Sequence, residues 1–171
     1  MITEVDGNLL TYSDLVVIGH QTNCLGVMGG GIARQIKNMH PEVFNEYNKL
    51  CRLHKDDRSL LGECLICKVN NSNKFVANIF GEYSFTESVA PFENRHTDYD
   101  ALRTALESFK NWCLSFINEN VVELPLKVGI PYKLGCGLAG GDWDNVVLPM
   151  IQEIFESEEK INLHIVKYSP F

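Results

Sequence analysis

The sequence IPYKLGCGLAGGDW at residues 130–143 indicates a strand, a loop and a helix in direct succession. An apolar run over Val128–Leu134 leads into four glycines within seven residues, and an Asp and an amphipathic segment follow at once. This order predicts a buried strand, a loop that contacts a ligand through its main chain, and a helix over Trp143–Phe155. Pro149 lies inside that helix and predicts a kink or a break in it.

A second stretch of the same kind lies near the N-terminus. The compact run Leu15–Ile18 ends in Gly19 and predicts a strand buried on both faces of a sheet. Polar residues follow at 20–23, then Gly26 and the triplet Gly29–Gly31, and a helix begins at Ile32. Free amides and the positive end of a helix dipole favour phosphate, so we prefer phosphate binding here to the alternative of a flexible linker.

Periodicity and turn residues predict the other elements, which alternate along the chain. The segment 70–73 is rich in Asn and joins two strands as a hairpin, and Gly81–Asn94 forms a loop over the site. The predicted strands are Ile2–Val5, Gly62–Val69, Lys74–Phe80 and Ile161–Val166. The predicted helices are Pro41–Leu53 and one that is capped by Thr97 and runs to about Ile117. Alternating strands and helices predict a three-layer α/β/α fold with a central mixed sheet, in a single domain over residues 1–171.

Composition excludes several classes of protein. A net charge of −7 argues against a broad surface for nucleic-acid phosphates, and no apolar run is long enough to span a bilayer. The N-terminus lacks the features of a signal peptide, so we expect a cytoplasmic protein. Most of the six cysteines lie in apolar segments and are expected to be reduced. Cys64 and Cys67 form a C-x-x-C, for which buried thiols are preferred to a metal or redox site because no second ligand pair lies at metal-site spacing.

The paired glycine-rich loops resemble those of macrodomains, the ADP-ribose-binding modules. The residues that carry the resemblance are Gly29-Gly30-Gly31-Ile32-Ala33 and Gly135-Cys136-Gly137-Leu138-Ala139-Gly140-Gly141. The similarity extends through Asp6–Leu10, the strand that ends near His20, the helix from Thr97 and the final strand. A single G-x-G-x-x-G would be a weak signal, whereas two such loops in this order are specific.

The resemblance implies a site for ADP-ribose. We expect this site to need no cofactor, and no metal because no cluster of metal ligands appears in the sequence. Asn8 stands where macrodomains carry an adenine-contacting Asp, Asn23 matches an Asn near the distal ribose, and Tyr168 either contacts adenine or packs locally. The ligand-binding residues implied in this way are Asn8, Leu9, Asn23, Gly29, Gly30, Gly31, Ile32, Gly135, Cys136, Gly137, Leu138, Ala139 and Tyr168.

The resemblance leaves three activities open. The first is hydrolysis of ADP-ribose 1″-phosphate to ADP-ribose and phosphate, and the second is removal of ADP-ribose from a modified protein or nucleic acid. The third is a binding module without catalysis. Some de-ADP-ribosylating macrodomains use a Lys together with an Asp that follows Gly-Cys-Gly-Leu. Here Ala139 stands in the place of that Asp, and the segment Phe80–Asn94 contains no Lys.

Two ionisable residues flank the predicted loops and are candidates for catalysis. His20 would act as nucleophile or as general acid, and Asp142 would orient it or activate water. Each also has a structural interpretation: His20 as a hydrogen-bonded core histidine, and Asp142 as the N-cap of the helix that begins at Trp143.

Overall fold

A six-stranded mixed sheet forms the centre of the computed structural model, which describes residues 1–89 and 94–169. The strand order is β1-β6-β5-β2-β4-β3; β3 pairs antiparallel with β4, and the other pairs are parallel. The strands are β1 (Ile2–Gly7), β2 (Val17–Gln21), β3 (Cys64–Lys68), β4 (Phe75–Ile79), β5 (Leu126–Pro131) and β6 (Ile161–Tyr168).

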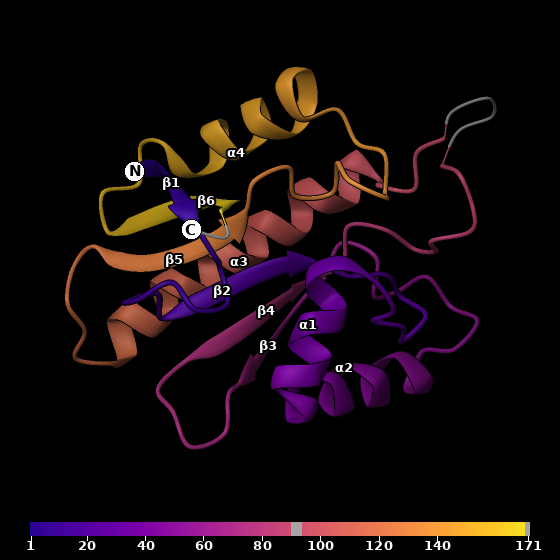
Figure 1. Cartoon of the computed structure of the whole chain (residues 1–171), viewed down its shortest axis with the longest axis horizontal. Coiled ribbons are helices and arrows are strands. Elements are labelled where there is room, and N and C mark those ends of the chain that lie inside the picture. Colours follow the sequence, from indigo (N-terminus) through magenta and orange to yellow (C-terminus); the bar gives the residue numbers. More distant parts are fainter. Residues whose placement is uncertain (90–93, 170–171) are drawn as a thin grey trace.

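Helices cover both faces of this sheet (Figure 1). One face carries α1 (Gly31–Met39) and α2 (Pro41–Leu53), and the other carries α3 (Tyr99–Glu119) and α4 (Leu148–Phe155). Neighbouring residues of β2 show the two layers, since Val17 belongs to the main core with α3 and α4 while Ile18 packs with Ile36 of α1. The predicted three-layer α/β/α fold with a mixed central sheet is confirmed.

The apolar stripe of α3 packs as its helical spacing predicts. Leu102, Leu106, Phe109 and Cys113 are fully buried and form the main core with the inner face of α4. Burial of each such side chain contributes roughly 1.5–3 kcal/mol to folding. The hairpin prediction is also confirmed, because β3 and β4 pair in antiparallel register on either side of the Asn-rich turn.

Two predicted strands are displaced along the chain. β2 begins at Val17 rather than Leu15 and continues through Gln21, because Leu15 turns out of the ladder into a cluster with Leu9 and Val166. β5 runs over Leu126–Pro131 rather than Val128–Leu134. Pro131 has no N–H to continue a ladder, and the chain then turns with the Leu134 amide bonded to the Pro131 carbonyl.

The helix starts differ from prediction at two places. Asp98, not Thr97, caps α3, and its carboxylate accepts a hydrogen bond of 3.1 Å from the Ala101 amide. The predicted helix over Trp143–Phe155 is divided into a π-helical turn at Trp143–Val147 and α4. Pro149 is the second residue of α4 and directly follows the π-helical turn, so the α-helical pattern is interrupted next to the proline.

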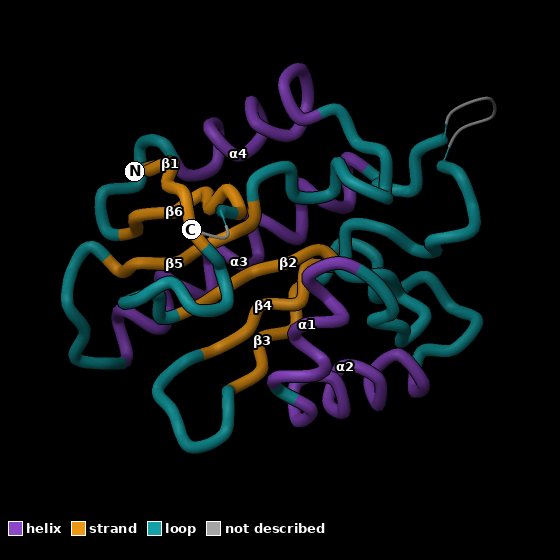
Figure 2. The backbone as a smooth tube through the Cα atoms, viewed as in Figure 1, coloured by secondary structure: helices purple, strands orange, loops and turns teal. Residues whose placement is uncertain are grey.

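The loops that follow β2, β4 and β5 gather on one side of the sheet, as Figure 2 shows. The predicted loop Gly81–Asn94 forms no helix or strand in its described part, and residues 90–93 lie outside the described residues. Within residues 1–89 and 94–169, no helix is both long and apolar enough to cross a membrane.

Candidate functional site

β2 and β5 are parallel neighbours in the sheet, and the connections that follow them lead to opposite faces. β2 leads through residues 22–30, here the first loop, into α1 on one face. β5 leads through residues 132–142, here the second loop, toward α4 on the other face. The carboxyl ends of adjacent parallel strands with connections to opposite faces form a crevice in which open α/β sheets bind ligands.

The two loops meet beyond the carboxyl ends of β2 and β5. A Cβ placed on Gly30 would lie 3.7 Å from Cδ1 of Leu138. In the described chain, the backbone amides of residues 29–32 and 137–139 donate no hydrogen bond to any protein group. Residues 31 and 32 belong to the first turn of α1, where amides have no intrahelical acceptor. Two runs of available donors therefore adjoin each other, which suits a ligand with several anionic oxygens.

Asn23 holds the first loop in shape. Its Oδ1 accepts hydrogen bonds from the Leu25 amide at 3.0 Å and from the buried Tyr47 hydroxyl at 2.8 Å. Its Nδ2 donates to the Val27 carbonyl at 2.8 Å. The Asn48 side chain of α2 also donates to the Gly26 carbonyl at 3.0 Å. The loop is thus fixed to α2 before any ligand binds, which lowers the entropy cost of binding.

A segment that follows β4 supports the second loop. The amides of His96 and Thr97 both donate to the Ala139 carbonyl, at 2.8 and 3.2 Å. The Thr97 hydroxyl donates to the Gly135 carbonyl at 2.7 Å and accepts from Nε2 of Gln21 at 2.9 Å. Gln21 ends β2, so these bonds tie the second loop to the strand that precedes the first.

His20 lies inside the protein. Its side chain is 0% exposed and points toward the α1 and α2 side of β2, and its Nε2 forms a 2.8 Å hydrogen bond with Oδ1 of Asn78 on β4. Burial lowers the pKa of His20 to about 4, against a smaller opposing effect of the Asn78 bond. This placement favours the alternative interpretation of His20 as a core histidine, because a substrate cannot reach the ring.

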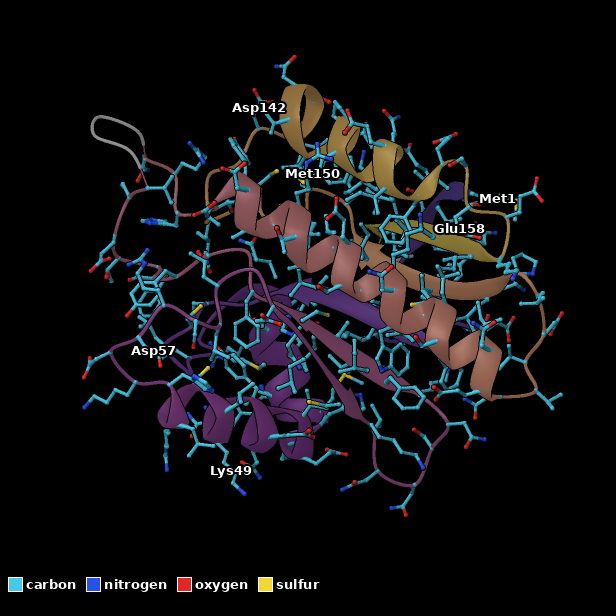
Figure 3. The ribbon with its side chains drawn as sticks, turned by 180° about the vertical axis from the view of Figure 1, so that it is seen from behind. Met1, Lys49, Asp57, Asp142, Met150 and Glu158 are labelled. Atoms are coloured by element: carbon cyan, nitrogen blue, oxygen red, sulfur yellow. The ribbon has the colours of Figure 1, made fainter. Side chains whose placement is uncertain are left out.

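Asp142 caps the helical segment that leads to α4, at the loop side of the sheet (Figure 3). Its Oδ1 accepts from the Asn145 amide at 3.1 Å, and its Oδ2 accepts from Nδ2 of Asn145 at 3.1 Å. These bonds lower the pKa of the Asp142 carboxyl below its ordinary value. The N-cap interpretation is confirmed, and a catalytic function of Asp142 stays a prediction.

Comparison with known proteins places this geometry in a family. The family model described as "Macro domain" matches residues 20–148, which include both loops and the crevice. The chain belongs to the macro domain family.

Individual relatives extend this result. Over 147 residues the macrodomain is 28% identical to an ADP-ribose 1″-phosphate phosphatase of Lodderomyces elongisporus, an alignment that covers 82% of this chain and 85% of that protein. Over 52 residues it is 46% identical to a DNA ADP-ribosyl glycohydrolase of Mycobacterium tuberculosis, which covers 30% of this chain and only 14% of that protein. The solved macrodomain of M. tuberculosis DarG shares the fold, with a TM-score of 0.74, 24% identity, and coverage of 100% of this chain and 99% of that one.

Three residues implied by the family resemblance lie at the carboxyl ends of β1 and β6. Gly7 pairs with Tyr168, which is 71% exposed, and Asn8 follows Gly7 directly. The Asn8 side chain accepts a hydrogen bond from the Leu10 amide at 3.0 Å and so shapes this turn of the macrodomain. Leu9 packs its side chain into the core, which leaves only its main chain for a ligand.

Positive charge lies next to the second loop. The ammonium groups of Lys133 and Lys167 lie 5.6 and 5.3 Å from the ring centroid of Tyr132, at the ends of β5 and β6. The carboxylates of Asp142 and Asp144 also act on Cys136 in this loop, so the charge around the second loop is mixed in sign. Cys136, in the same loop, is half-buried, and burial raises the pKa of its thiol to about 12, so it is a poor nucleophile.

Sequence reasoning missed the residues that join the two loops. Thr97 was predicted only as a helix cap, Gln21 only as one of several polar residues after a strand, and His96 without a function. The pairing of these segments comes from long-range contacts over more than 35 residues, such as that between Thr97 and Gly135, and no local pattern encodes it. In the described residues, no group of three or more His, Cys, Asp or Glu side chains could hold a metal ion.

Proposed function

We propose that this macrodomain binds ADP-ribose and hydrolyses ADP-ribose 1″-phosphate to ADP-ribose and phosphate. The observation that carries the proposal is the meeting of two runs of backbone amides, at residues 29–32 and 137–139, beyond the carboxyl ends of β2 and β5, where they donate to no group of the described residues. A diphosphate supplies acceptors for both runs at once, and amides fixed in advance stabilise negative charge that develops on phosphoryl oxygens.

The relatives favour the phosphatase among the three activities. The alignments that span most of this chain, 82% and 84% of it, are with proteins named ADP-ribose 1″-phosphate phosphatase. A calorimetric titration with ADP-ribose, followed on the same sample by phosphate release from the 1″-phosphate, tests binding and turnover separately. Saturable binding with phosphate release supports the proposal. Absence of ADP-ribose binding contradicts it.

A second candidate is removal of ADP-ribose from DNA. It is favoured by the 46% identity to the mycobacterial DNA ADP-ribosyl glycohydrolase over 52 residues, although this match is short and covers a small share of that protein. An oligonucleotide that carries ADP-ribose distinguishes this activity, since its release without phosphate release from the 1″-phosphate would reverse our order of preference. Binding without either reaction would identify a non-catalytic module.

We also propose that residues 1–171 form a single macrodomain. The family model ends at residue 148, but β6 lies in the same sheet between β1 and β5 and is needed to complete it. A cytoplasmic location is proposed because all six cysteines are unpaired, as is usual in reducing compartments.

A further inference from the structure

The hydroxyl of Tyr99 holds the end of the second loop. It accepts a hydrogen bond of 3.0 Å from the amide of Asp142, the last residue of that loop. Earlier in the loop, the Thr97 hydroxyl donates to the Gly135 carbonyl at 2.7 Å, and the Thr97 amide donates to the Ala139 carbonyl at 3.2 Å. One short segment before α3 and the first residue of that helix therefore bind the loop at its start, middle and end.

Tyr99 is itself fixed by the core of the protein. It is the first residue of α3, which Asp98 caps by accepting from the Ala101 amide at 3.1 Å. Its ring packs against the main core, and the guanidinium of Arg95 lies 4.0 Å from the ring centroid. The hydroxyl thus belongs to a helix whose place does not depend on the loop.

Asp142 is held on two sides. Its main-chain amide donates to Tyr99, and its side chain accepts from the Asn145 amide at 3.1 Å. The first bond joins the loop to α3, and the second joins it to the helical segment that leads to α4. The point at which the loop ends is therefore set by two helices on the same face of the sheet.

Hydrogen bonds inside the loop connect this end to the amides at residues 137–139. The Gly140 amide donates to the Gly137 carbonyl at 3.0 Å, and the Gly141 amide donates to the Gly135 carbonyl at 3.0 Å. A shift of the end of the loop would therefore move the amides that the proposed function assigns to the ligand.

We propose that Tyr99 is a positioning residue for the second loop, an assignment that rests on the proposed binding of ADP-ribose. Its hydroxyl fixes the amides at residues 137–139 through Asp142 rather than by contact with the ligand. Donors that are fixed in advance lose less entropy when the ligand binds. The hydroxyl should therefore strengthen binding of substrate and transition state alike, which lowers KM and leaves kcat unchanged.

The test uses Tyr99→Phe, which removes the hydroxyl and keeps the ring beneath Arg95. We expect Tyr99→Phe to bind ADP-ribose about three- to tenfold more weakly than wild type, with the KM for the 1″-phosphate raised in proportion and kcat within about twofold. Tyr83→Phe is the matched control, because the Tyr83 ring also lies beneath a guanidinium, that of Arg58 at 3.9 Å, while its hydroxyl makes no hydrogen bond to the described residues. It should match wild type in each measurement.

Amide hydrogen exchange separates positioning from a general loss of stability. In Tyr99→Phe the Asp142 amide should exchange about tenfold faster, while the amide of Leu106 in the buried part of α3 keeps its wild-type protection. The thermal midpoint should stay within about 4 °C of wild type. Faster exchange throughout α3 would assign Tyr99 to the stability of the core and overturn the proposal.

Two kinetic results would also overturn it. One is an unchanged affinity of Tyr99→Phe for ADP-ribose, and the other is a lower kcat at an unchanged KM, which would assign the hydroxyl to the chemical step. If the wild type binds ADP-ribose but releases no phosphate, the comparison of affinities alone decides the assignment. Absence of ADP-ribose binding by the wild type refutes the proposed function and this assignment together.

Discussion

The Thr97 hydroxyl donates a 2.7 Å hydrogen bond to the Gly135 carbonyl, and this bond joins the segment after β4 to the second glycine-rich loop. Thr97 is fully buried, and its oxygen also accepts from Gln21. One hydroxyl therefore satisfies both a loop carbonyl and the side chain that ends β2. Because the same loop carries the free amides of residues 137–139, its rigidity bears directly on ligand binding.

Replacement of Thr97 by Val should lower the free energy of unfolding by about 1–3 kcal/mol, because Gly135 and Gln21 then each lose a buried partner. The affinity for ADP-ribose should fall as well, since the second loop is less fixed. Urea unfolding and calorimetric titration measure the two effects. Thr97→Ser retains the hydroxyl and serves as the control. Equal losses in both variants would show that the methyl group, not the hydrogen bonds, matters here.

Replacement of Gly30 by Glu should weaken ADP-ribose binding by at least about tenfold, or 1.4 kcal/mol. The added side chain would enter the space beside Leu138 where the loops meet. Gly30→Ala is the matched control, because a Cβ at 3.7 Å makes only an ordinary contact and the backbone at Gly30 is extended, with φ of −148°. Titration of both variants with ADP-ribose tests the loop assignment, which unchanged affinity of Gly30→Glu would contradict.

The buried His20 should make stability depend on pH. Its folded pKa is lowered from 6.5 to about 4, so the unfolded chain binds a proton that the folded protein excludes. The part of the free energy of unfolding that depends on neutral His20 is fully present above pH 6.5. It is lost as the pH falls toward 4, by about 3 kcal/mol in all. Urea unfolding at several pH values should show a shallower decline for His20→Gln than for wild type.

Asp142 can be tested as cap and as catalyst with two substitutions. Asp142→Ala loses the bond to the Asn145 amide and should lower the thermal midpoint by about 2–4 °C. Asp142→Asn keeps an acceptor suited to an N-cap and should preserve the midpoint. Phosphate release by Asp142→Asn then decides the second function, because a base that activates water must be ionisable. Full activity of this variant would remove Asp142 from the catalytic candidates.

The sequence predicts the layers and both loops because each depends on local patterns. The stripe from Leu102 to Cys113 encodes a helix face, and glycine triplets between a strand and a helix encode an anion-binding loop. Strand ends were less predictable. Leu15 reads as part of β2, yet its side chain stabilises the core better beside Leu9, a contact that no local pattern encodes.

The catalytic candidates were harder to predict than the loops for the same reason. His20 follows an apolar run, and its burial depends on Asn78, 58 residues away. Proximity of side chains from three separate connections is a property of the tertiary fold, so sequence spacing alone could not provide it.

Leu138 is 91% exposed and stands where the two loops adjoin. An apolar side chain in this position is hydrated in the free protein and loses that water when a nucleotide is seated over it. Association should therefore lower the heat capacity of the system, so that the binding enthalpy becomes more negative on warming. Ligand binding is thus stabilised by dehydration of the Leu138 side chain as well as by the hydrogen bonds of the backbone amides.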